Sequence, residues 1–145
     1  MSFTLPASYG EADRATQRLC QAAAPYLDAE RLLRFELAIA EALNNIVRHA
    51  YGEVPGKMID VGLFAAGDGV HAVLRDTGAP PPAGLFDRRA QASHEQDETT
   101  IDPLAESGRG MMVIGHSVDQ LSYRRAAQGN ELTLTVLKTQ RNGGR

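Results

Sequence analysis

Apolar and polar residues alternate along the chain in patterns that predict short strands and amphipathic helices. Residues 2–8 alternate in part and predict an edge strand, and residues 11–24 have a helical pattern that Pro25 closes. The strongest signal lies at residues 28–50, where apolar residues recur every three or four positions, as on one face of an amphipathic helix. The stripe that we expect to face the core consists of Leu33, Leu37, Ala40, Leu43, Val47 and Ala50.

Two strands are predicted after this helix, at residues 58–65 and 70–76, and the glycine-rich link between them is typical of a β-hairpin. A long polar segment follows. In its central part, residues 91–100, the only apolar residue is Ala92. Because a polar connection of that length is usually functional or disordered, we predict a mobile lid over about residues 84–107.

Regular structure is predicted again in the last third of the chain. Apolar residues between Met111 and Val118 predict a short buried helix, and residues 121–125 and 131–138 alternate as two further strands. The predicted order is one strand, two helices, two strands, the lid, one helix and two strands. This order indicates a single α+β domain over residues 1–140, with helices on one face of a largely antiparallel sheet and a disordered tail at 141–145.

The composition is that of a globular domain with an ordinary core. The 145 residues are 43% hydrophobic and carry a formal net charge of −3. No apolar run approaches the ~20 residues of a membrane span, and no signal segment stands at the N-terminus, so a cytoplasmic protein without a membrane partner is expected. The slight acidity disfavours direct binding to nucleic acid. Cys20 is the single cysteine, which excludes a disulfide within one chain.

Three polar side chains follow one another at intervals of four on the long predicted helix: Glu41, Asn45 and His49. We expect them to fan over the side away from the apolar stripe. A solvated polar face is the plainest interpretation of this pattern. Asn44 and Asn45, however, are poor residues for a helix interior. A carboxylate and an amide oxygen on adjacent turns would also suit a general base and a metal ligand.

Two glycine-containing motifs add candidate chemistry. Asp76-Thr77-Gly78 directly follows a predicted strand. It is compatible with an ordinary turn, or with a carboxylate that accepts a hydrogen bond from the exocyclic amine of adenine. Ser107-Gly108-Arg109-Gly110 precedes a predicted helix. It is compatible with a hinge, or with a phosphate site built from glycine N–H groups, the helix N-terminus and an arginine.

Taken in this order, the motifs resemble those of the GHKL, or Bergerat-fold, ATPases. Residues 41–51, EALNNIVRHAY, look like the N box of that family, and the His-Ala-Tyr ending is similar to the small bacterial anti-sigma-factor serine/threonine-protein kinases. Residues 75–78 resemble the adenine-binding box and residues 107–111 the second glycine box. The resemblance extends over about residues 3–138. It implies a two-layer α/β sandwich, the fold of a histidine-kinase-like ATPase domain with an ATP lid.

The resemblance implies a role for each matching residue. Glu41 would be the general base and Asn45 the Mg²⁺ ligand, with His49 also in the nucleotide site. Asp76 would contact adenine, and Gly78 would pack against the base. The residues that would hold the phosphates are Gly108, Arg109 and Gly110. The expected cofactors are therefore ATP and Mg²⁺.

The chain departs from the family pattern at two places. The adenine box usually continues with a second Gly or a Pro and then Phe-Asp-Pro, but residues 79–87 read APPPAGLFD, as though several residues were inserted. Near the C-terminus, Gly129-Asn130-Glu131 stands where the family has a Gly-Thr pair. The second departure predicts that a hydroxyl near the phosphates is absent.

The function implied by the resemblance is that of an ATP-dependent regulatory kinase. It would phosphorylate a serine or threonine of a STAS-type anti-anti-sigma partner, and it would also be able to sequester a sigma factor. Related kinases commonly dimerise, so a homodimer is one expected assembly. The main alternative is a non-catalytic ATP-binding, partner-switching module of the same fold. An ATPase domain of a sensor histidine kinase and an unrelated α+β interaction domain are further alternatives.

Overall fold

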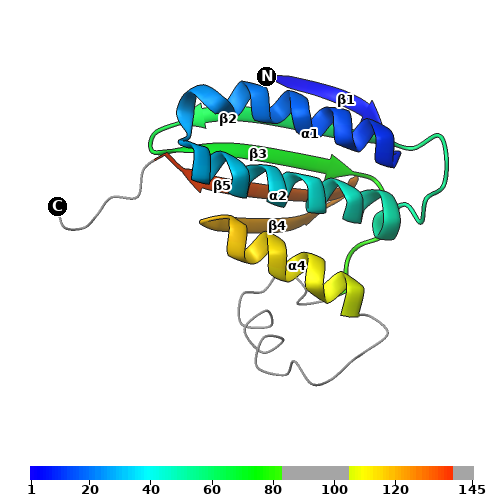
Figure 1. The fold of residues 1–145 in the computed structure, drawn as a ribbon. Coiled ribbons are helices and arrows are strands. Elements are labelled where there is room, and N and C mark those ends of the chain that lie inside the picture. The colour runs from blue at the N-terminus through cyan, green and yellow to red at the C-terminus, as the bar shows by residue number, and fades with distance from the viewer. Residues whose placement is uncertain (83–104, 139–145) are drawn as a thin grey trace.

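A five-stranded sheet with a layer of three helices on one face forms the structure, a computed structural model that describes residues 1–82 and 105–138, apart from the side chains of 105–109 and 111 (Figure 1). The strands are β1 (Ser2–Pro6), β2 (Met58–Ala66), β3 (Gly69–Asp76), β4 (Gln120–Ala126) and β5 (Gly129–Leu137). The helices are α1 (Tyr9–Ala23), α2 (Ala29–Asn45) and α4 (Ala105–Ser117), with a 3₁₀ turn, η1 (Ala24–Tyr26), and a π-helical turn, η2 (Ile46–Ala50). The predicted α+β fold is confirmed.

The sheet has the strand order β1-β2-β3-β5-β4, and all neighbouring strands are antiparallel. β1 is an edge strand, as predicted, and β2 and β3 form the predicted hairpin. The pairing of β3 with β5 places Asp76 opposite Asn130, although the two residues are 54 positions apart in the sequence. The end of β3 and the start of β5 therefore lie side by side, at one end of these two inner strands.

The core lies between the helices and the sheet. Its fully buried side chains come from both layers, and each contributes about 1.5–3 kcal/mol through removal of its apolar surface from water. The largest of them include Phe35, Ile39, Leu43, Ile59, Leu74, Ile114 and Leu134. None of the helices in the described part of the chain has the length and apolar composition that crossing a membrane requires.

The stripe predicted for α2 is wrong in its first half. Leu33 and Leu37 are 55% and 46% exposed, whereas Phe35 and Ile39 are fully buried. The reason is that α2 is the middle helix of its layer: the sheet lies on one side of it, and α1 and α4 lie on its two flanks (Figure 1). Apolar residues occur on two different faces of α2, and the face that contains Phe35 is the one that packs against the sheet. The prediction holds for Leu43 and Val47, which are buried.

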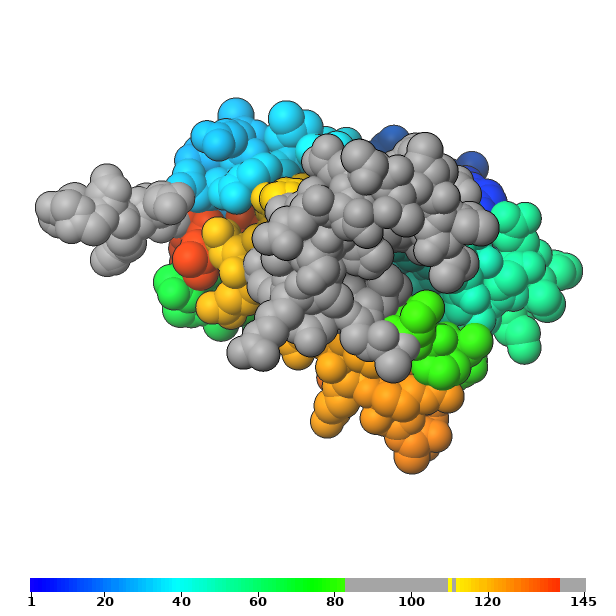
Figure 2. All heavy atoms as spheres, turned by 90° about the horizontal axis from the view of Figure 1, so that it is seen from below, coloured from blue at the N-terminus to red at the C-terminus, as the bar shows by residue number. Residues whose placement is uncertain are grey.

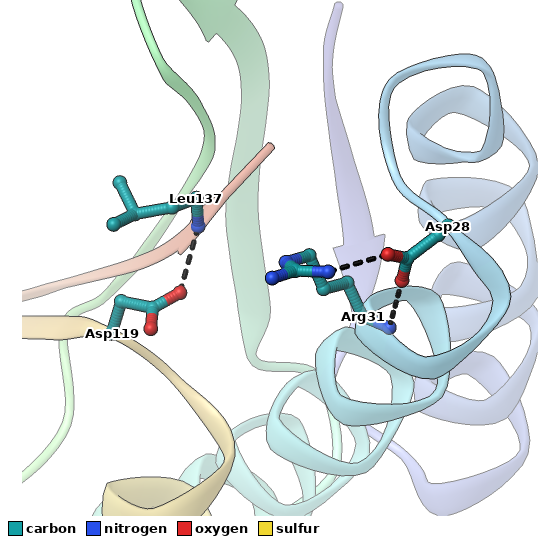
Figure 3. Close-up of polar contacts among 4 residues, drawn as sticks. All are labelled: Asp28, Arg31, Asp119 and Leu137. Carbon is teal, nitrogen blue, oxygen red and sulfur yellow. Dashed lines mark hydrogen bonds and ion pairs between the residues drawn. The ribbon is translucent and has the colours of Figure 1, made fainter. Parts of the chain in front are cut away.

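The ends of α2 and α4 are fixed by aspartates (Figure 3). Asp28 caps α2 by accepting a hydrogen bond from the N–H of Arg31 (2.8 Å), and it also forms an ion pair with the Arg31 side chain. This cap confirms the predicted start of the long helix. Asp119 follows α4 and accepts a hydrogen bond from the N–H of Leu137 (2.8 Å). That bond joins the C-terminal end of α4 to the end of β5.

Candidate active site

Glu41 and Asn45 lie on the flank of α2 that faces α4, and both are half-buried. The neighbour on α4 is Gly110: a Cβ at this position would lie 2.9 Å from Glu41 Oε1 and 3.4 Å from Asn45 Nδ2. The plain alternative of a fully solvated polar face does not describe these two side chains, because α4 lies against that flank. Within the described residues, neither side chain has a hydrogen-bond partner. A carboxylate and an amide are thus held side by side with their polar atoms available to a ligand.

His49 does not continue the arrangement of Glu41 and Asn45. The α-helix ends at Asn45, and His49 lies in the π-helical turn that follows, with its side chain exposed. His49 therefore does not lie on the same helical face as Glu41 and Asn45, because the number of residues per turn changes after Asn45. π-Helical turns are rare and occur often at functional sites.

The second glycine motif lies inside α4 and not before it. The helix begins at Ala105, so residues 107–110 occupy its first turns. In an α-helix only the first four N–H groups lack an intrahelical partner. The amides of Arg109 and Gly110 are consequently part of the helix in this structure. Binding of phosphates by these two amides would require the start of α4 to shift towards Met111. The rest of the predicted lid, residues 84–104, lies outside the described residues, as does the predicted tail.

Asp76 is a buried carboxylate at the end of β3, with 6% of its surface exposed. Its Oδ1 atom accepts two hydrogen bonds of 2.8 Å, from the N–H of Gly78 and from Nδ2 of Asn130. Its Oδ2 atom accepts none from the described residues. Burial raises the pKa of Asp76 above its usual range, while the two hydrogen bonds and the nearby charge of Arg125 oppose that rise. The free oxygen is therefore the one that a ligand can reach.

The loop after Asp76 is held on one side by the end of the long helix. The N–H of Ala79 donates to the carbonyl of Ala50 (2.9 Å), and a Cβ on Gly78 would lie only 2.3 Å from that same oxygen. The hydroxyl of Tyr51 accepts a hydrogen bond from the N–H of Thr77 (2.9 Å). Because only glycine fits so close to the Ala50 carbonyl, Gly78 is required for this contact.

The other side of the loop is held by the start of β5. A Cβ on Gly129 would lie 2.0 Å from the carbonyl oxygen of Asp76, and Asn130 donates to the carbonyls of Gly78 (3.3 Å) and Ala79 (3.1 Å). The space-filling view shows the green segment that follows β3 beside the orange turn between β4 and β5 (Figure 2). The loop is thus enclosed between two parts of the backbone.

The arrangement joins two groups of predicted site residues through one helix. Glu41 and Asn45 lie near the end of α2 and face α4, and Ala50, in the π-helical turn that follows, contacts the loop after Asp76. The side chain of Arg109 is outside the described part of the structure. The site therefore offers an acceptor oxygen of Asp76 at one end. At the other end it offers the Glu41 carboxylate beside the Asn45 amide.

Four residues around Asp76 were not predicted as part of the site: Tyr51, Tyr123, Arg125 and Asn130. In the sequence, Tyr51 stands at the end of the N-box motif, and Asn130 stands at a departure from the family pattern. The departure was expected near the phosphates, but Asn130 contacts Asp76 instead. A polar residue after a turn glycine, at the start of an alternating strand, was the signal that could have found it. The pairing of β3 with β5 was needed to show which residue it would face.

Comparison with known proteins identifies the family of this chain. The family described as the histidine kinase-like ATPase domain matches residues 4–136. The chain is also similar to the serine/threonine-protein kinase BtrW of Bordetella bronchiseptica, with 33% identity over 112 residues, which cover 71% of this chain and 70% of that protein. The matched region contains α1, α2 and α4. It also contains the whole sheet, apart from the first two residues of β1 and the last residue of β5. The chain therefore belongs to the histidine kinase-like ATPase domain family.

Proposed function

We propose that the protein is an ATP-dependent serine/threonine-protein kinase that regulates transcription in the cytoplasm through partner switching. Its substrate would be a serine or threonine on a small STAS-type anti-anti-sigma protein, and its second partner a sigma factor that it sequesters. The observation that carries the proposal is the pairing of Glu41 with Asn45 beside α4, together with the free oxygen of Asp76. The name of the relative from Bordetella bronchiseptica, a serine/threonine-protein kinase, supports the same activity.

The adenine end of the proposed site is the loop after β3. Asp76 offers one unoccupied carboxylate oxygen, which suits the exocyclic amino group of adenine as a donor. Guanine carries an oxygen at that position, and two acceptors facing each other repel. Gly78 lets the loop lie against the Ala50 carbonyl, and this contact holds the loop beside Asp76.

The phosphate end of the proposed site is the region where α2 meets the start of α4. The side-chain oxygen of Asn45 is a hard oxygen ligand without a hydrogen-bond partner among the described residues, so it fits a Mg²⁺ ion held between the protein and the phosphates. Mg²⁺ bound there would neutralise negative charge on the phosphate oxygens.

Glu41 is the proposed general base. The hydroxyl oxygen of the partner's serine or threonine attacks the γ-phosphorus in line, and its proton passes to the Glu41 carboxylate. The bond between the γ-phosphorus and the bridging oxygen breaks, and that oxygen leaves with its electron pair on ADP. Most of the rate in such reactions comes from positioning and electrostatics, and a carboxylate held against α4 can position the attacking hydroxyl.

The test is direct. The purified full chain is mixed with Mg²⁺, ATP and each STAS-domain protein of its host, and intact mass spectrometry shows whether any of them gains one phosphate group. Glu41→Gln should still bind ATP, while the transfer rate falls roughly 10²–10⁴-fold. Glu36→Gln, an exposed position on the same helix, is the matched control and should leave the rate unchanged.

Asn45→Ala separates metal-dependent binding from proton transfer. Loss of the amide oxygen should weaken ATP binding in the presence of Mg²⁺ as well as transfer, which Glu41→Gln does not. If ATP binds normally but no STAS protein is phosphorylated, the kinase is excluded in favour of the non-catalytic module. If ATP does not bind, both functions fail.

A further inference from the structure

Asn130 has an unusually complete set of hydrogen bonds for a side chain at the start of a strand. It is 6% exposed, and its Nδ2 donates to Asp76 Oδ1 (2.8 Å). Its Oδ1 accepts from the hydroxyl of Tyr123 (2.6 Å) and from Nη1 of Arg125 (2.8 Å). Both ends of the amide are therefore engaged, and no atom of Asn130 is left to contact a ligand directly.

These partners fix which way the amide points. Arg125 is a donor without acceptor capacity, so it must face the oxygen of Asn130. The carboxylate of Asp76 is an acceptor, as are the carbonyls of Gly78 and Ala79, so the NH₂ group must face them. A flipped amide would oppose donor to donor and acceptor to acceptor. Chemistry therefore determines the orientation of Asn130.

The same logic extends to Asp76. Its Oδ1 atom is shared between two donors, the Asn130 amide and the N–H of Gly78. The two donors fix the rotation of the Asp76 carboxylate about its Cβ–Cγ bond, and Oδ2 is the oxygen turned away from both of them. Among the residues that the structure describes, the charged and titratable groups near this carboxylate include Arg125 and Tyr123 from β4, and Tyr51, which contacts the neighbouring Thr77.

We propose that Asn130 is a positioning residue that sets the base selectivity of the nucleotide site. It commits one oxygen of Asp76 to itself and to the Gly78 N–H, and thereby leaves the other oxygen as the acceptor for an amino group on the base. The inference rests on the proposed function, because it concerns the base of a bound nucleotide. Asn130 acts through Asp76 and does not touch the base.

The decisive variant is Asp76→Asn. The oxygen of the new amide would face the two donors that now hold Oδ1, so its NH₂ group would replace Oδ2. The site would then present a donor in place of an acceptor. A donor suits the exocyclic carbonyl oxygen of hypoxanthine and not the exocyclic amino group of adenine. ATP and inosine triphosphate differ in this exocyclic group and in the proton on the neighbouring ring nitrogen N1, and are therefore the probes.

Calorimetric titration of the full chain gives the affinity for both nucleotides. The unmodified chain should prefer ATP, and Asp76→Asn should lower the ratio of ATP to inosine triphosphate affinity by roughly tenfold or more. If Asp76→Asn binds nucleotide and keeps the original ratio, the inference is overturned while the proposed function stands. If the unmodified chain binds neither nucleotide, both are overturned.

A second measurement, the titration of Asp76, needs no nucleotide. Carbon-13 NMR titration of the Asp76 carboxyl should show a higher pKa in Asn130→Ala than in the unmodified chain, because a donor to the charged form is removed. The pH below which ATP binding weakens should rise with it. Asn130→Thr restores one donor and should return both values most of the way. Thr133→Ala, farther along β5, is the control. An unchanged Asp76 pKa in Asn130→Ala would show that Asn130 does not stabilise the charged Asp76 carboxylate, and would overturn the inference.

Discussion

Tyr51 and Thr77 are joined at two atoms: the hydroxyl of Tyr51 accepts from the backbone N–H of Thr77 at 2.9 Å and lies 3.2 Å from its Oγ1. The same hydroxyl donates to the carbonyl of Met58 at 2.6 Å. One buried side chain at the end of the long helix therefore links the start of β2 to the loop after β3.

Tyr51→Phe should destabilise the protein by about 1–3 kcal/mol, because the Met58 carbonyl and the Thr77 N–H lose their partner while the ring remains in place. Urea unfolding followed by circular dichroism measures this change. Tyr26→Phe is the control, because Tyr26 is 46% exposed and should tolerate the loss of its hydroxyl. Equal stability of the two variants would show that the Tyr51 hydroxyl is replaced by water without cost.

Gly110→Ala should impair phosphoryl transfer without destabilising the fold. The new methyl group would come within 2.9 Å of Glu41 Oε1, so the Glu41 carboxylate must move, which a flexible side chain can do at small cost. Alanine is also favoured over glycine in a helix by about 1 kcal/mol. We expect an unchanged or higher melting temperature and a lower transfer rate.

Gly10→Ala is the matched control for this change, since a Cβ on that helical glycine would meet nothing within 4 Å. It should raise stability in the same way and leave transfer unaffected. A Gly110→Ala variant with full activity would show that the position of Glu41 in this structure is not the one used in transfer.

Asp28 should make the stability of the protein depend on pH in the acid range. Its hydrogen bonds with Arg31, first to the backbone N–H and then to the side chain, lower its pKa below the usual 3.8. A lowered pKa in the folded state means that the stabilisation is present above pH 3.8 and is lost as the pH falls through the folded-state value. Asp28→Asn keeps a capping oxygen but does not titrate. Its melting temperature should therefore lie below that of the unmodified chain at neutral pH, and the difference should shrink towards pH 3.

Cys20 should react slowly with thiol reagents in the folded protein. Burial, followed by the negative charge of Glu36, raises the pKa of its thiol to about 11. At pH 8 the thiolate fraction is then very small, and the thiolate is the reactive form. Alkylation by iodoacetamide should be much faster in urea than in buffer, and Glu36→Gln should speed the reaction of the folded chain. A rapid reaction in buffer would contradict the burial of this side chain.

The sequence predicted most of the fold because its strands and helices have strong local signals. The Asp28 cap marks the start of α2 within one residue, and the glycine-rich link places the hairpin of β2 and β3 correctly. The burial of α2 was harder to predict, since Leu33 and Phe35 belong to different faces of the same repeat. Only the neighbouring helices decide which face meets the sheet.

The site was predicted as separate motifs, and the structure brings together those parts that it describes. Glu41 and Asn45 could be paired from their spacing alone, whereas their contact with Gly110 depends on how α4 packs. Asn130 could not be assigned to Asp76 from the sequence, because the two residues are 54 positions apart and only the strand pairing brings them together. Long-range pairing, and not local propensity, was the missing information.

The tight enclosure of the Gly78 loop has a thermodynamic consequence. Its backbone is held between Ala50 and Gly129 by contacts within the protein itself. Fixing a flexible loop during binding costs roughly 1–2 kcal/mol for each residue whose backbone is ordered. A ligand that places its base here is spared that entropic cost. Adenosine alone should therefore bind with a small entropy penalty, and whatever ordering cost accompanies ATP binding should arise where the phosphates lie.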